Sequence, residues 1–258
     1  MQETVKEYQE LEVHILPTRK EMGEQAGKRI EEIINAAIRE NGEARVIFAS
    51  APSQNEMLNY LKGAAIDWSK VVGFHMDEYV GIDKNAPQSF TKFLEERLIQ
   101  YVSIGKWYPF GGTTPSVEED LALYTKLLNE KPIDLVILGI GENGHLAFND
   151  PAFCDFHDPL TVKVVSLDEV CRNQQVNDGC FERLEDVPKE ALTITIPPLL
   201  KCRKKVAVVP GPTKRSAIKN TLLGEITENC PASILRKTPN SELYVDYDSY
   251  MLVEELKL

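Results

Sequence analysis

The chain has 258 residues, 43% of them hydrophobic, enough to bury a substantial core in one α/β domain or in two smaller ones. Its formal net charge of -11 at pH 7 disfavours nucleic acid and anionic membranes as partners, because its field repels phosphates and anionic headgroups. Its cysteines form no CxxC pair, and no leader or apolar run of roughly 20 residues is found, so we expect a cytoplasmic protein without a metal, a redox cofactor or a membrane span.

Strands and helices are predicted in alternation along the chain. An apolar stretch at Leu11–Leu16 is followed, after Pro17-Thr18, by a long amphipathic helix that Asn41-Gly42 closes. A second helix is predicted at Ser89–Leu98, with Ser89 as its cap. Short apolar runs typical of buried strands lie at Arg45–Ala49, Val71–Met76, Ile133–Gly139 and Lys205–Val209.

This alternation predicts an α/β fold with a doubly wound, mostly parallel sheet that has helices on both faces. Ligands of such sheets gather at the carboxyl ends of the strands. No repeat or linker divides the chain, so we expect residues 1–258 to form a single domain. Two polar segments, Phe153–Pro159 and Asn173–Lys189, have the composition of lids or insertions.

A glycine-rich turn follows one predicted strand in Ile137–Pro151, ILGIGENGHLAFNDP. It matches the G-x-G-x-x-G dinucleotide fingerprint, but Asn149-Asp150-Pro151 interrupts the helix that this fingerprint requires, so we disfavour a nucleotide site. His145 lies between Asn143 and Asp150, close enough for a side chain to fix the tautomer of its imidazole. His145 suits acid–base catalysis, and a structural histidine in a loop is an equal alternative.

Two acids end the apolar strand in Val71–Tyr79, VVGFHMDEY. If Asp77 points into the crevice, it can act as a base for a carbon-bound proton, and Glu78 or Tyr79 could position it or the substrate. The alternative is a helix cap or a solvated turn, which is commoner for an isolated Asp-Glu pair.

An anion site is predicted where Lys205–Lys219 passes from a strand through a Pro-Gly-Pro turn into a helix. Free backbone donors and Lys214 would converge there, which suits a phosphate monoester, with a solvated basic helix start as an equal alternative. Three residues in Ile47–Leu58 could add donors to the same phosphate, although such residues also cap helices: Ser50, Ser53 and Gln54.

Together these segments resemble the glucosamine-6-phosphate deaminase/isomerase family, which shares a superfamily with 6-phosphogluconolactonase. The resemblance implies a modified Rossmann-like fold and conversion of an amino-sugar 6-phosphate into a ketose 6-phosphate and ammonia, without a cofactor. The motifs that carry it are MDEYVG at Met76–Gly81, PQSF at Pro87–Phe90, GHLAFNDP at Gly144–Pro151, VPKEALTITIPPLL at Val187–Leu200 and VVPGPTK at Val208–Lys214.

The resemblance also implies residue roles. Asp77 would move a proton between carbons, His145 would help to open the sugar ring, and Asp150 would hold His145 in place. The expected partner is a small phosphorylated amino sugar, and association into a homo-oligomer is left open. The substrate-binding and phosphate-binding positions would be Ser50, Ser53, Gln54, Gly144, Arg172 and Lys214.

Several positions depart from the family pattern. Asn143 stands where an aspartate is usual, Asp150 replaces a glutamate, and Ser53-Gln54 replaces a Gly-Gly-Thr-Pro turn. Phe153–Pro159 lacks the basic residues of an amino-sugar effector site. These departures leave the gluco or galacto configuration of the substrate, the rate and the regulation open.

Two other functions compete with the deaminase. A 6-phosphogluconolactonase shares the fold, but its pattern continues toward Ser-Leu-Phe-Pro after the histidine, whereas this chain has LAFNDP and carries MDEY. The second is a sugar-phosphate sensor with weak turnover, which Asn143, Asp150 and the altered phosphate loop favour. The deaminase remains the preferred interpretation.

Overall fold

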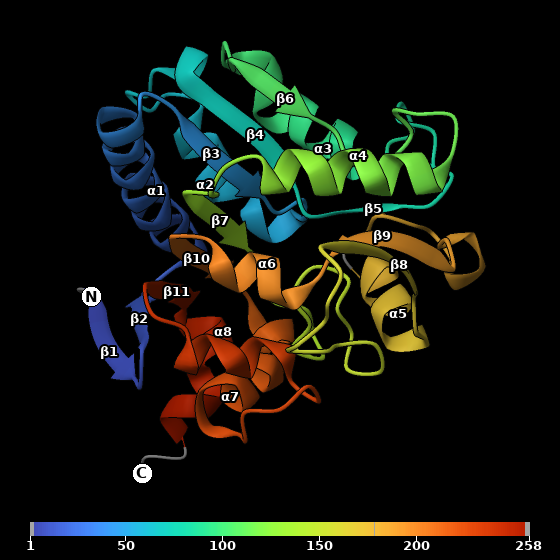
Figure 1. The fold of residues 1–258 in the computed structure, drawn as a ribbon. Coiled ribbons are helices and arrows are strands. Elements are labelled where there is room, and N and C mark those ends of the chain that lie inside the picture. Colours follow the sequence, from blue (N-terminus) through green and yellow to red (C-terminus); the bar gives the residue numbers. More distant parts are fainter. Residues whose placement is uncertain (1–2, 178, 256–258) are drawn as a thin grey trace.

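The main sheet of the computed structural model, which describes residues 3–177 and 179–255, has eight strands in the order β1-β2-β11-β10-β7-β3-β4-β6 (Figure 1). β1 is antiparallel to β2, and every other neighbouring pair is parallel. The strands are β1 Thr4–Tyr8, β2 Leu11–Leu16, β3 Ala44–Phe48, β4 Val71–His75, β6 Lys106–Tyr108, β7 Leu135–Leu138, β10 Lys204–Val209 and β11 Ser241–Asp246.

Helices cover both faces of this sheet. The central strand β3 shows why: Val46 and Phe48 belong to the apolar cluster of one face, and Ile47 to that of the other. The first face packs against α1 Arg19–Asn41, α2 Asn55–Leu61 and α3 Phe90–Arg97, and the second against α4 Val117–Asn129, α6 Ile196–Lys201, α7 Arg215–Leu223 and α8 Tyr247–Glu255. The doubly wound, mostly parallel fold is therefore confirmed.

The ends of the predicted helices follow from local chemistry. Thr18 caps α1 by accepting a hydrogen bond from the Glu21 amide, and α1 ends at Gly42, whose φ of 78° suits glycine. Ser89 caps α3 in the same way, through the amide of Lys92. No helix among the described residues is long and apolar enough to cross a membrane.

A second, smaller sheet was not predicted. Its strands are β5 Asp77–Tyr79, β9 Glu190–Ile194 and β8 Val162–Ser166, paired antiparallel in the order β5-β9-β8. It packs with α5 Glu169–Asn177 beside the main sheet (Figure 1). The polar segment Asn173–Lys189 thus begins inside a helix, and its Asp178 lies outside the described residues.

Candidate active site

A cleft opens at the carboxyl ends of β10, β7, β3 and β4, which are neighbours in the sheet. Its empty volume is ≈ 650 Å³, a figure that includes space open to solvent. The loops after all four strands contribute to its walls, as expected for this fold. The predicted site residues that line it are Ser50, Ser53, Asp77, His145 and Lys214.

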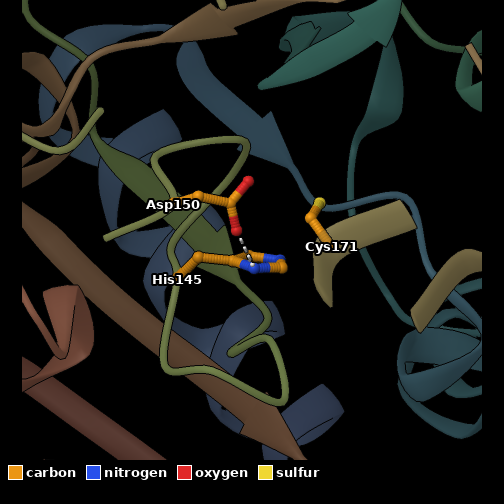
Figure 2. A group of neighbouring side chains, drawn as sticks. All are labelled: His145, Asp150 and Cys171. Carbon is orange, nitrogen blue, oxygen red and sulfur yellow. Dashed lines mark ion pairs between the residues drawn. The ribbon is translucent and has the colours of Figure 1, made fainter. Parts of the chain in front are cut away.

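The loop after β7 places His145 in the wall of this cleft. The His145 Nδ1 lies 2.9 Å from the Asp150 Oδ1, so Asp150 orients the ring as predicted (Figure 2). The ring has room only because residue 141 is glycine: a Cβ there would lie 2.2 to 2.4 Å from three imidazole atoms. The loop therefore brings the histidine close against its own backbone.

Asn143 completes this loop. Its Nδ2 donates to the Asp150 Oδ1 at 2.8 Å, and its Oδ1 accepts a hydrogen bond from the His145 amide at 3.0 Å. An aspartate could accept the second bond but could not donate the first. The amide at position 143 is therefore matched to the Asp150 carboxylate, to which it donates.

The Asp150 carboxyl is buried, and burial opposes its ionisation. The neighbouring His145 and hydrogen bonds from His145, Asn143 and Cys171 outweigh burial, so the pKa of Asp150 is lowered from its usual value. Burial, with the charge of Asp150, raises the pKa of the Cys171 thiol. Cys171 is therefore a protonated donor beside the carboxylate (Figure 2).

In the described part of the chain, two groups of side chains bring possible metal ligands within 4.8 Å of one another. They are His145, Asp150 and Cys171, and Glu12, His14 and Glu242. In the first, the ligand atoms already serve the hydrogen-bond network just described. In the second, Arg29 holds the Glu242 carboxylate at 2.9 to 3.0 Å. Neither group offers a set of uncommitted ligands.

Asp77 reaches the cleft from the first position of β5. Burial, reinforced by the charge of Glu78, raises the pKa of Asp77 well above its usual value. Among the described residues, the Asp77 carboxylate makes no hydrogen bond of its own. Its lone pairs therefore face the cleft unoccupied by protein donors, as a base for a carbon-bound proton requires.

Glu78 and Tyr79 lie elsewhere. The Glu78 carboxylate holds the start of α3, accepting from the Ser89 hydroxyl at 2.8 Å and the Thr91 amide at 3.0 Å. Tyr79 packs in the small aromatic cluster with Phe90 and Phe148. Neither is among the residues that line the cleft, and the charge of Glu78 acts on Asp77 by raising its pKa. A positioning role for either residue stays a prediction.

The predicted phosphate residues divide into two groups. Lys214 is buried in the turn before α7 and lines the cleft together with Ser50 and Ser53. Gln54 lies behind this wall, where its Nε2 donates to the Ser53 Oγ at 2.9 Å and to the Val208 carbonyl at 3.1 Å. Gln54 thus ties the loop after β3 to β10 and does not line the cleft itself.

Arg172 and Gly144 also differ from expectation, since neither lines the cleft. The Arg172 guanidinium satisfies carbonyls of the segment after α5, those of Leu184 at 2.5 Å and Val187 at 3.2 Å. Gly144 shapes the histidine turn instead: its φ is 87°, and a Cβ there would meet the Cys230 Sγ at 2.7 Å.

Residues of α5 line the cleft without having been predicted. Gln174 and Gln175 are buried in its wall, and the Gln174 Oε1 accepts from the Glu142 amide at 2.8 Å. With Cys171 they follow the i, i+3, i+4 spacing of one helix face. That spacing could have indicated that the three residues share one face of a helix. Two glutamines and a cysteine do not form the apolar stripe by which a buried helix face is usually recognised in a sequence.

Comparisons with known proteins agree with this geometry. A family model described as glucosamine-6-phosphate isomerases/6-phosphogluconolactonase matches residues 17–159. The chain is 32% identical over 245 residues to proteins named glucosamine-6-phosphate deaminase from Bacillus cereus and Bacillus thuringiensis, covering 95% of this chain and 90% of theirs.

Solved structures of proteins from this family match the chain over most of its length. A monomeric glucosamine-6-phosphate deaminase superposes with a TM-score of 0.84 at 25% identity, covering 93% of this chain and 99% of that one. A 6-phosphogluconolactonase from Shewanella baltica shares the fold at a TM-score of 0.75 and 17% identity, covering 91% of this chain and 96% of that one. This chain is therefore an enzyme of the glucosamine-6-phosphate isomerase/6-phosphogluconolactonase family, on its deaminase/isomerase side.

Proposed function

We propose that the chain converts an amino-sugar 6-phosphate and water into a ketose 6-phosphate and ammonia. The observation that carries the proposal is the convergence of Asp77, His145 and Lys214 on one cleft. They supply a base, an acid–base imidazole and a cation. We further propose that residues 1–258 act as one catalytic domain, because the walls of the cleft are drawn from segments between Ala49 and Lys214.

The chemistry follows from the residues present. His145, oriented by Asp150, moves a proton on the ring oxygen as the sugar opens. Asp77 removes the proton from the carbon that bears nitrogen and returns it to the neighbouring carbon, while a second proton passes from the nitrogen to the former aldehyde oxygen. The aldose thereby becomes an imine at the ketose position. Water adds to that imine, the carbon–nitrogen bond breaks, and ammonia leaves with the proton count unchanged.

The test is a substrate panel. Ammonia release would be measured with glucosamine 6-phosphate and galactosamine 6-phosphate, and acid release with 6-phosphogluconolactone. Turnover of an amino sugar supports the proposal and identifies its configuration. Lactone hydrolysis alone would assign the chain to the hydrolases, and a thermal shift with any of the ligands but no turnover would make it a sensor.

Lys214→Met is expected to act on affinity. The phosphate is remote from the reacting carbons, so its contact with Lys214 is much the same in the ground and transition states. Loss of a charged hydrogen bond of about 1.5–3 kcal/mol should raise KM by roughly 10- to 100-fold and change kcat little. Lys219→Met on α7, the helix that follows Lys214, lies outside the cleft and is the matched control. An unchanged KM would remove Lys214 from the phosphate site.

Asn143→Asp is expected to lower the stability of the folded protein in a way that depends on pH. The variant loses a donor to Asp150 and sets two carboxylates against each other, so one of them takes up a proton at a raised pKa. The folded variant then binds more protons than the unfolded chain, and its stability falls as pH rises. Thermal melts should show a larger Tm loss at pH 8 than at pH 5. An equal Tm loss at both pH values would contradict the carboxylate contact.

A further inference from the structure

A buried histidine lies two residues before the proposed base and outside the cleft. His75, at the end of β4, has no exposed surface. Its ring packs against Trp107 and Phe110, with centroids 5.6 and 6.5 Å away. Nothing in the chemistry proposed above uses this imidazole, so its burial needs a separate explanation.

The hydrogen bonds of His75 define its tautomer. The Phe110 amide donates to the Nε2 at 2.7 Å, so that nitrogen must be the acceptor. The Thr91 hydroxyl lies 3.1 Å from the same atom and donates to it as well. The proton therefore lies on the Nδ1, which donates to the Asp77 main-chain carbonyl at 2.9 Å.

The imidazole is also held in its neutral form. Burial lowers the pKa of His75 to about 4, against the opposing effect of its bond to Asp77. The groups around it come from four segments, and none of those that contact the ring carries a charge: the Asp77 carbonyl, the Thr91 hydroxyl, the Phe110 amide and the Trp107 ring. A single donor and a single acceptor thus persist across neutral pH.

Asp77 needs such support from its main chain. A carboxylate that takes a proton from carbon must keep its lone pairs free, so side-chain hydrogen bonds cannot fix it. One side of the backbone is fixed where the Ile194 amide donates to the Met76 carbonyl at 2.8 Å. The other side, at the Asp77 carbonyl, is fixed by His75.

We propose that His75 is a positioning residue for the reaction, which fixes the Asp77 carboxylate in the cleft through its main-chain carbonyl. This inference rests on the proposed function. The imidazole then has a mechanical role, because its two nitrogens connect β5 to α3 and to the Phe110 segment. Asp77 thereby keeps one position relative to His145.

Two variants separate the bonds of this imidazole. In His75→Asn the amide nitrogen stands about where Nδ1 stood and can still donate to Asp77. In His75→Gln the amide oxygen stands nearer to Nε2 and can still accept from Phe110 and Thr91, but the bond to Asp77 is lost. Misplacing a reacting group by about 1 Å costs roughly 10²-fold in rate. We expect kcat to fall about 10²-fold in His75→Gln and less than about tenfold in His75→Asn, with KM nearly unchanged in both.

Thr91→Val is the matched control, because it removes a partner of Nε2 and leaves the bond to Asp77. It should keep kcat even if its Tm falls. Equal kcat in the Asn and Gln variants, or a kcat loss that simply follows Tm across all three variants, would overturn the proposal.

A measurement without turnover keeps the inference separate from the proposed function. Nitrogen-15 NMR of the wild-type histidines should show a neutral Nδ1–H imidazole from pH 6 to 8. If the wild-type protein releases no ammonia, only the proposed function is contradicted. An Nε2–H tautomer or a charged ring at pH 7 would overturn the role of His75 whether or not the enzyme turns over.

Discussion

Asp77→Asn is expected to lower kcat by the ~10²–10⁴-fold typical of losing a general base, with the fold and the affinity for phosphate nearly intact. The substitution keeps the shape of the side chain and removes its basicity. The raised pKa of Asp77 adds a pH dependence: as pH falls through it, the carboxylate takes up a proton and can no longer act as a base. The acidic limb of the wild-type kcat/KM profile should therefore lie above the usual range of an aspartate.

Asp83→Asn is the control for this variant, because Asp83 is exposed in the loop after β5 and outside the cleft. Circular dichroism and a thermal melt would show that both variants fold. Near wild-type turnover of Asp77→Asn on an identified substrate would mean that another group is the base, and the role given to His75 would end with it.

Four central strands of the main sheet, β3, β4, β7 and β10, could be predicted because they are buried on both faces. Continuous apolar runs such as Arg45–Ala49 and Val71–Met76 indicate buried strands. β3 begins one residue before the first run, and β4 lies within the second. The small antiparallel sheet could not be predicted in this way. β5 has only three residues, and β8 alternates buried and exposed residues in a segment with many polar neighbours.

Resemblance and geometry contributed different parts of the site. Motifs placed Asp77, His145 and Lys214 at strand ends, and the fold brings those ends together. They did not reveal that Arg172 is engaged by the carbonyls of Leu184 and Val187, because such contacts depend on how the chain turns after α5. The motifs also did not reveal what Asn143 does. Its contacts with Asp150 and with the His145 amide become visible only from the distances within the histidine loop.

The second prediction of large effect concerns Gly141→Ala. A Cβ at this position would lie 2.2 Å from the His145 Cε1, 2.3 Å from its Nδ1 and 2.4 Å from its Nε2. Such separations are far below contact distance, and φ at Gly141 is not positive, so the clash and not backbone strain is the problem. The imidazole must move away, and it loses its 2.9 Å contact with Asp150 as it does so.

We expect kcat of Gly141→Ala to fall by roughly 10²-fold or more, since a displacement of about 1 Å of an acid–base group is enough for such a loss. The chain offers a matched control in Gly139→Ala two residues earlier, whose Cβ would meet only the Gln54 Nε2 at 3.5 Å and the Ser53 Oγ at 3.7 Å. Both variants add one methyl group to the same loop. If they lose activity equally, the loop is merely sensitive to bulk, whereas full activity of Gly141→Ala would mean that the position of the His145 ring against residue 141 is not the one used in catalysis. A large loss at 141 beside a small one at 139 would assign the function of this glycine to the space it leaves for the histidine.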